Sequence, residues 1–240
     1  MSAMPGTPRG PAARPGRTSR ALLYVLAIAV TLFMLLPVYL ILIAALSPRS
    51  AIYKFPKSLM PTNFSLETMS FFLNSTGVLQ SAINSVLVGL LTLVLSLLVG
   101  APAGYALARF VFRGRDAFRL FIVSTRAFPI VILSVPLAVT FLKWGMYDTV
   151  FAVALVHTAL TLPTTVLITA SVFAGVPQEL EEAALTLGCT PMSAFRQVSL
   201  PLALPGIAAA SIFTFVLSWN EVFAATILTL QNRTLPAQVL

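Results

Sequence analysis

Long runs of apolar residues, each about as long as a lipid bilayer is thick, dominate this sequence. A helix that spans a membrane needs about 20 consecutive residues that are mostly apolar. Five stretches meet this length, at approximately 21–46, 81–103, 120–141, 150–173 and 204–228. Because hydrocarbon offers no hydrogen-bond partners to an open backbone, such runs fold as internally bonded helices. The sequence therefore predicts an all-α, polytopic membrane helix bundle with five spanning helices.

The composition agrees with a membrane protein and argues against a soluble one. Hydrophobic residues make up 58% of the 240 residues and charged residues only 9%, whereas soluble domains carry about 25% charged residues. A chain with so few charges cannot cover a water-facing surface in the usual way. Prolines interrupt several apolar runs, and Pro129 and Pro136 both fall in the third. Such prolines can kink a membrane helix, whose neighbours then satisfy the freed carbonyl groups.

The net charge of +8 is concentrated next to the apolar runs. Arginines precede the first run and follow the second, at Arg9, Arg14, Arg17 and Arg20 and at Arg109, Arg113, Arg115 and Arg119. Juxtamembrane arginines fix orientation and contact anionic lipid, so we assign this charge to membrane lipid and expect no nucleic-acid binding. With a cytoplasmic N-terminus, the inner segments hold nine lysines and arginines and the outer segments five. This difference favours a cytoplasmic N-terminus.

The chain divides into a short tail and one membrane domain. Residues 1–20 are rich in Pro, Gly, Ala and Arg and lack a periodic apolar pattern, so we expect a disordered, basic cytoplasmic tail. A cleaved signal peptide is the alternative, but the following apolar run is too long and has no clear small-residue cleavage site. Residues 21–240 are expected to form the transmembrane domain.

The most informative polar segment is residues 175–202, which separate the fourth and fifth apolar runs. Pro177 suits the first turn of a helix, and Gly188 can end that helix in a left-handed conformation. Thr190 then supplies an N-cap for a second short helix, which we expect Pro201 and the following Pro-Gly pair to end. The segment therefore predicts two short helices joined at a glycine. An ordinary amphipathic connector lying on the membrane is the alternative.

The order of residues in this segment resembles the EAA signature of the permease subunits of ABC importers. The signature is an acid and two alanines, three residues, a glycine, and an ending of the form hydrophobic-x-Leu-Pro. Here it is read at Glu182, Ala183, Ala184, Gly188 and residues 198–201. Further matches to the carbohydrate-uptake subfamily, the second permease subunits of maltose-type and trehalose-type importers, lie at residues 63–67, 84–85, 103–109 and 219–221. The similarity extends from about residue 21 to the end of the chain.

The resemblance implies a set of partners and a division of labour. In such importers two permease subunits form the pathway, a cytoplasmic ATPase dimer binds ATP, and an extracytoplasmic solute-binding protein delivers the sugar. Residues 175–202 are then the cytoplasmic coupling loop, which docks on the ATPase through Glu182, Ala183, Ala184, Leu187, Gly188 and Pro201. This chain itself is expected to bind no cofactor, because it lacks a G-x-x-x-x-G-K-[ST] phosphate loop. Nor does it carry a His/Cys/carboxylate cluster that predicts a metal site.

The resemblance also implies a sixth spanning helix, reached through a further outer loop, and a short cytoplasmic tail. These 240 residues contain neither. We therefore expect the chain to be truncated at its C-terminal end.

Four polar residues inside the apolar runs are candidates for the solute pathway: Arg126, Thr161, Asn220 and Glu221. An ionisable residue inside a membrane is a functional hypothesis by default. Arg126 either lines the pathway or extends its guanidinium to the inner interface. Burial of Glu221 is costly unless it is paired or faces water, so we expect a pathway-facing or bracing position near the threonines of the fourth run. We interpret His157 as a hydrogen-bonded bundle residue rather than a proton relay.

The sequence therefore predicts a multi-pass protein of a bacterial-type inner membrane that carries a sugar or sugar-like solute and is not itself an enzyme. A permease for a polyamine or another small solute is the alternative within the same class. A stand-alone secondary transporter would not require the glycine-jointed loop. A membrane enzyme would need polar catalytic clusters at helix ends, which the sequence lacks.

Overall fold

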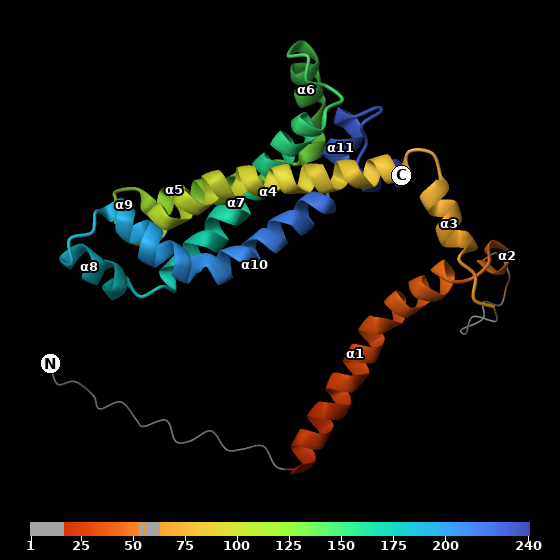
Figure 1. Ribbon diagram of the computed structural model, residues 1–240, viewed down its shortest axis with the longest axis horizontal. Helices are drawn as coiled ribbons and strands as arrows, with labels where there is room; N and C mark the ends of the chain where they lie inside the picture. The colour runs from red at the N-terminus through yellow and green to blue at the C-terminus, as the bar shows by residue number, and fades with distance from the viewer. Residues whose placement is uncertain (1–16, 53–54, 56–62) are drawn as a thin grey trace. The chain divides into compact units, whose positions relative to one another are not determined.

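The computed structural model describes residues 17–52, 55 and 63–240, and every regular element in those residues is a helix (Figure 1). Two compact units make up the chain, Met1–Ser75 and Thr76–Leu240. The expected disordered tail lies mostly outside the described residues, as do Lys54 and Lys57, two of the five basic residues counted in the outer segments. The first helix begins at Arg17, inside the segment expected to be tail.

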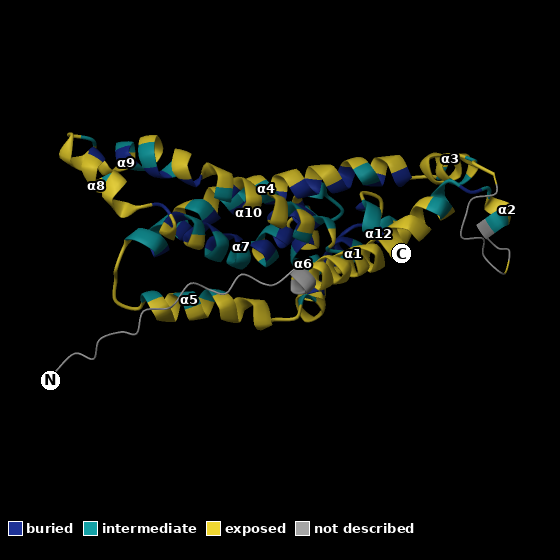
Figure 2. Ribbon diagram, turned by 90° about the horizontal axis from the view of Figure 1, so that it is seen from below, coloured by how far each residue is buried: buried dark blue, intermediate teal, exposed yellow. Residues whose placement is uncertain are grey.

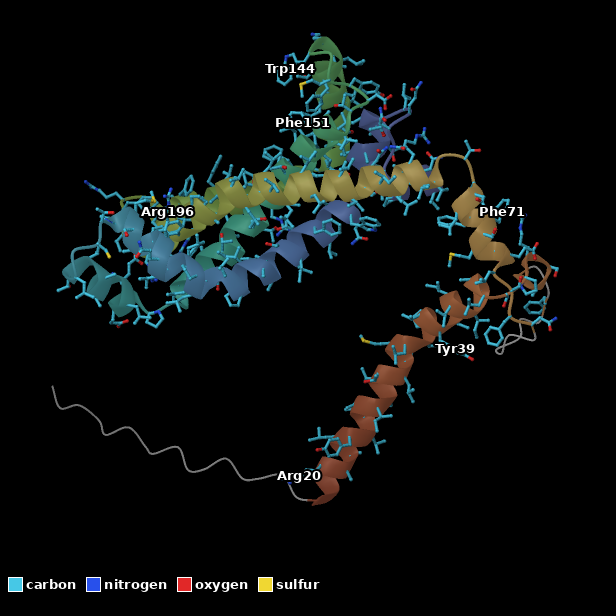
Figure 3. The ribbon with its side chains drawn as sticks, in the orientation of Figure 1. Arg20, Tyr39, Phe71, Trp144, Phe151 and Arg196 are labelled. Carbon is cyan, nitrogen blue, oxygen red and sulfur yellow. The ribbon has the colours of Figure 1, made fainter. Side chains whose placement is uncertain are left out.

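The first unit contains one long apolar helix and two short ones. Helix α1 (Arg17–Ala45) is long and apolar enough to span a membrane, and its described side chains are exposed along most of its length, as expected for a helix that faces lipid. Helices α2 (Arg49–Ile52) and α3 (Glu67–Asn74) follow it. The Arg49 guanidinium lies 3.7 Å from the centre of the Phe71 ring (Figure 3). This cation–π contact connects the two short helices.

The second unit is built on three long helices that pack against one another: α4 (Val78–Arg109), α7 (Val150–Ala174) and α10 (Leu200–Trp219). Each of these three helices contacts the other two (Figure 1). The remaining elements are α5 (Arg115–Ser124), η1 (Thr125–Ala127), α6 (Ile130–Lys143), α8 (Gln178–Thr186), α9 (Pro191–Ala194), the π-turn η2 (Phe195–Ser199), α11 (Phe223–Leu228) and α12 (Leu235–Val239).

Small residues allow α4 and α7 to approach closely. A Cβ placed on Gly104 of α4 would lie 2.2 Å from Thr169 Oγ1 and 2.7 Å from the backbone nitrogen of Ala170 on α7. Because backbone cannot yield to such a contact, only glycine fits at residue 104. Small residues at helix contacts are typical of membrane bundles, where close backbone packing replaces the hydrophobic drive available in water.

Buried hydroxyl groups hold the same three helices together. Ser96 of α4 and Thr161 of α7 are hydrogen-bonded at 2.9 Å, and Thr165 of α7 meets Thr214 of α10 at 2.9 Å. Thr169, which also lies against Gly104, donates to the Gly100 carbonyl at 2.9 Å. Hydrogen bonds between membrane helices supply interactions that apolar packing alone cannot. The long helices therefore form one firmly connected core.

The third apolar run is not the single straight span that its hydropathy predicts. It forms α5 with η1 and then α6, and the two parts are bent by 84°. Pro129 stands at the break and has no N–H, and a residue before proline disfavours the helical region; Phe128 is accordingly extended, at φ −79° and ψ 116°. By length and composition four described helices can cross a membrane, or five if the bent pair counts as one span.

The fifth run also differs from its prediction at both ends. The expectation that Pro201 ends the second short helix is wrong, because helix continues from Pro191 through Trp219. The backbone N–H of Leu200 reaches the Phe195 carbonyl, five residues back. Pro201 then lies in the first turn of α10, where its missing N–H is harmless. The helix stops at Trp219 rather than continuing to residue 228.

A carboxylate clamp connects the loop before α7 to the segment between α11 and α12. Asp148 Oδ1 accepts backbone N–H groups from three consecutive residues, Leu230 at 2.8 Å, Gln231 at 3.0 Å and Asn232 at 3.0 Å. Partial burial of Asp148 acts to raise its pKa, but these three hydrogen bonds to the ionised form outweigh it and hold the pKa below its usual value. The clamp therefore requires an ionised Asp148.

We expect Asp148→Asn to lower the free energy of unfolding by about 1 kcal/mol at neutral pH, because an amide oxygen accepts these bonds more weakly than a carboxylate. A depressed folded-state pKa gives stability that is complete above the unfolded-state pKa, about 3.9, and that is lost as pH falls through the folded-state pKa. Thermal unfolding of purified protein at a series of pH values should therefore show a smaller acid-induced loss for Asp148→Asn. Asp116→Asn is the control, because its side chain is 95% exposed; an equal effect there would contradict the clamp.

Candidate functional site

The polar segment after α7 has the predicted first short helix and glycine joint, but its second helix, α9, runs on through η2 into α10. Helix α8 carries acidic residues in its first turn and ends before Gly188. Gly188 has φ +94°, and a Cβ there would meet no atom within 4 Å. Glycine is therefore needed at this position for backbone conformation and not for space. Thr190 then caps α9 by accepting the Ser193 N–H at 3.2 Å.

Most of the residues predicted to couple to an ATPase face outward on this loop. Glu182 and Ala183 are exposed, and Leu187, directly before the glycine, is 87% exposed. Ala184 is the exception, because it is the buried residue of α8. Pro201 is exposed but belongs to α10, beyond both short helices. Figure 2 shows the largely exposed surface of α8.

Glu181, which was not among the predicted coupling residues, anchors the loop to the bundle. Its Oε2 accepts Arg109 Nε at 3.0 Å and Ser199 Oγ at 2.6 Å, and its Oε1 accepts the Tyr105 hydroxyl. Burial of Glu181 acts to raise its pKa, but the hydrogen bonds from Ser199 and Tyr105 and the Arg109 charge hold the pKa below its usual value. The Glu182 carboxylate beside it accepts Gln178 Nε2 of the same helix at 3.0 Å. No pattern in the sequence distinguishes the role of Glu181 from that of Glu182.

A second polar site lies deep in the bundle and centres on His157. His157 Nε2 lies 3.1 Å from Glu221 Oε2, and His157 Nδ1 lies 2.9 Å from Ser218 Oγ. The His157 side chain is fully buried and the Glu221 side chain is 16% exposed. The structure therefore shows His157 as a hydrogen-bonded bundle residue paired with a carboxylate.

The apolar surroundings of Glu221 in the sequence predict that it lies inside a helix. The structure places it outside one. It follows the end of α10, and its carboxylate accepts the backbone N–H groups of Phe223 and Ala224 at 3.1 and 3.0 Å. These bonds satisfy the first free N–H groups of α11. The break between α10 and α11 thus presents the Glu221 carboxylate to α7.

Three of the four candidate pathway residues line one cavity of about 150 Å³. Arg126, Thr161 and Glu221 share its wall with His157, Leu160, Leu217 and Ser218. Arg126 comes from η1 at the bend, and its exposed guanidinium has no hydrogen-bond or ion-pair partner in the described part of the chain. Asn220 is not among the lining residues; it is exposed and donates to the Val216 carbonyl at 2.9 Å.

A metal site would need a different grouping of side chains. Among residues 17–52, 55 and 63–240, no three His, Cys, Asp or Glu side chains come together as metal ligands would. The polar cavity instead offers one guanidinium, one imidazole, one carboxylate and hydroxyl groups. This set can donate and accept hydrogen bonds to a polar solute.

The fold and these two sites define a multi-pass helical membrane protein with a polar cavity inside the bundle and an outward-facing, glycine-jointed loop at its end. Residues 100–239 match the family described as binding-protein-dependent transport system inner membrane components. The chain belongs to this family, which confirms the resemblance found in the sequence. It is therefore a multi-pass transport subunit of the inner membrane.

Individual relatives and one solved structure agree with this assignment. The chain is 32% identical over 207 residues to the trehalose transport system permease protein SugB of Mycobacterium tuberculosis (strain CDC 1551 / Oshkosh), covering 86% of this chain and 75% of that protein. It is 32% identical over 210 residues to the diacetylchitobiose uptake system permease protein NgcG of Streptomyces coelicolor (strain ATCC BAA-471 / A3(2) / M145), covering 88% and 69%. The crystal structure of a bacterial ABC transporter involved in alginate import has the same fold, with a TM-score of 0.73, 23% identity, and coverage of 95% of this chain and 81% of that one.

Proposed function

We propose that this chain is one of two homologous permease subunits of an ABC importer for a sugar or sugar-like solute. Its relatives include permeases named for trehalose and diacetylchitobiose transport. The polar cavity supports a polyhydroxylated solute, because its hydroxyl, guanidinium and carboxylate groups are the donors and acceptors that sugar hydroxyls need. Arg126, Thr161 and Glu221 are its proposed solute contacts, and an extracytoplasmic solute-binding protein delivers the solute.

The exposed elbow around Gly188 carries the proposal that a cytoplasmic ATPase dimer drives transport. Leu187 is a large apolar side chain that is 87% exposed in a polar loop outside the spanning helices. The left-handed turn at Gly188 and the cap at Thr190 fix its position. Leu185 on α8 and Met192 on α9 are exposed as well. Exposed apolar side chains on a loop of fixed shape are suited to a groove on a soluble partner. Residues 175–202 are accordingly proposed as the docking loop.

The distribution of arginines supports a cytoplasmic position for this loop. Arg109, at the end of α4, is ion-paired with Glu181 of α8, so the arginine cluster at residues 109–119 lies at the loop end of the second unit. Arg196 lies on η2 beside the same loop (Figure 3). Because cytoplasmic segments carry an excess of Lys and Arg, this end faces the cytoplasm. Alternation of the spans then gives a cytoplasmic N-terminus.

We expect Leu187→Asp to remove most of the ATPase that copurifies with the permease, by about tenfold or more, because a buried charge replaces an apolar anchor at the contact. Quantitative copurification from membranes that express the complete transporter measures this result. Val111→Asp is the matched control, because Val111 is 91% exposed in the short loop between α4 and α5. Full retention of the ATPase by Leu187→Asp would reject docking at the elbow. Absence of any ATPase from the wild-type complex would reject the proposal that an ATPase drives transport.

A further inference from the structure

The Glu181 carboxylate joins three segments that are far apart in the sequence. It belongs to α8, while its partners Tyr105 and Arg109 belong to the end of α4 and Ser199 belongs to η2, directly before α10. Arg109 Nη2 also donates to the Val176 carbonyl at 3.0 Å, just before α8. Glu181 therefore connects the first short helix of the loop to two of the three long helices of the bundle.

The surroundings of this cluster leave it little freedom to deform. The Arg109 and Glu181 side chains are only 8% and 13% exposed. The Tyr105 ring packs against Phe195 and Phe173, with ring centres 4.6 and 5.3 Å apart, and Phe173 is fully buried. Packed contacts of this kind change between discrete arrangements rather than deforming continuously. A displacement of α8 would therefore be passed on through the cluster instead of being absorbed by it.

Ser199 belongs to a turn that departs from regular α-helix. It is the last residue of the π-turn η2, and it donates to Glu181 at 2.6 Å. A π-turn inside a helix is rare and is found frequently at functional sites. Here the wide turn lies where the loop becomes α10, and its last hydroxyl meets the carboxylate of α8. The feature that departs from regular helix thus takes part in the same cluster.

We propose that Glu181 is the positioning residue that makes α8 move as one body with α4 and α10, so that displacement of the loop by an ATPase reaches the bundle. This inference rests on the proposed docking of an ATPase at residues 175–202. The neighbouring Glu182 has a different part, because it is exposed and bonded only within α8. The two adjacent carboxylates therefore have different roles. Glu182 lies on the docking face, and Glu181 transmits the motion to the helices.

The test is a distance measurement between spin labels on α8 and α4 in the complete, ATPase-bound transporter. Labels at Glu179→Cys and Leu98→Cys, both exposed positions, are placed in a Cys189→Ser background. The distance distribution is recorded without nucleotide and with ATP and vanadate. Glu181→Gln keeps the side-chain volume and removes the charge, and Tyr105→Phe removes one donor but keeps the packed ring. Thr186→Ala is the matched control, because its hydroxyl bonds only to the Glu182 carbonyl of the same helix.

We expect a narrow distribution that ATP and vanadate do not shift in the otherwise wild-type protein and in Thr186→Ala. In Glu181→Gln it should broaden and shift with nucleotide while the ATPase stays bound, and Tyr105→Phe should show a smaller change in the same direction. A shift in the wild-type protein, or unchanged narrow distributions in both variants, would overturn the role of Glu181. Loss of folded protein in both variants would assign it to stability alone and would overturn it too. Failure of the wild-type chain to retain an ATPase would instead reject the proposed function.

Discussion

Gly188→Val is expected to uncouple ATP hydrolysis from solute uptake or to weaken ATPase docking, while membrane insertion stays intact. Gly188 has φ +94°, a conformation that costs a β-branched residue about 1–3 kcal/mol. Because a Cβ at this position meets no atom within 4 Å, the cost comes from the backbone and falls on the turn itself. The turn relaxes, Leu187 and α8 change their direction relative to α9, and the docking surface loses its shape.

The experiment compares ATP hydrolysis, solute uptake and ATPase copurification for three variants of the complete transporter. Gly114→Val is the matched control, because Gly114 also has a positive φ, 88°, and open space around it, but lies between α4 and α5. Gly188→Asn should retain more coupling than valine, since asparagine tolerates the left-handed region better than other side chains. Normal coupled transport by Gly188→Val would refute the elbow mechanism. A matching defect in Gly114→Val would show that any strained turn at this end has the same effect.

The loop geometry was predictable because it is local. Gly188 and Thr190 each fix a backbone state within a few residues of themselves, and the structure has the expected turn and cap. Pro177 lies one residue earlier than expected, as the N-cap of α8. The end at Pro201 was mispredicted because proline is compatible with the first turn of a helix, and whether a new turn begins there depends on the preceding π-turn. The prolines of the third run indicated a possible kink, but not that Pro129 breaks the run by 84° while Pro136 lies inside α6, since an average hydropathy does not register one broken backbone position.

The contacts that make the sites were not predictable from local patterns. Glu181 and Glu182 have the same chemistry and adjacent positions, and only the position of α8 against η2 turns the first toward Tyr105 and Arg109. The polar cavity was partly predictable, because ionisable residues in apolar runs must find partners or water. Sequence therefore singled out Arg126 and Glu221, but not the end of α10 that brings Glu221 beside His157.

Glu221→Ala is expected to abolish or alter solute uptake while the transporter still assembles. The carboxylate is the acceptor for His157 Nε2 at 3.1 Å and for the Ala224 N–H at 3.0 Å. Its loss leaves the buried Nε2 without this partner, at a cost of about 1–3 kcal/mol, while Nδ1 keeps its contact with Ser218. It also removes the only carboxylate from the wall of the polar cavity. Uptake by reconstituted transporter and copurification of the ATPase measure the two results separately. Ser211→Ala is the control on α10, because the Ser211 hydroxyl donates to the Ile207 carbonyl of its own helix and the structure records no other bond for it among the described residues.

Glu221→Gln distinguishes the two roles that the position allows. If Glu221 only braces the start of α11, an amide oxygen can accept the same backbone N–H groups, and uptake should stay near the wild-type rate. If the carboxylate contacts the solute or orients His157 toward the cavity, the neutral amide fails, because charged acceptors bond about twice as strongly as neutral ones. We expect the second outcome, since the carboxylate lines the cavity together with Arg126 and Thr161. Wild-type uptake by Glu221→Gln would remove Glu221 from the pathway and leave Arg126 as the only ionic solute contact proposed for this cavity.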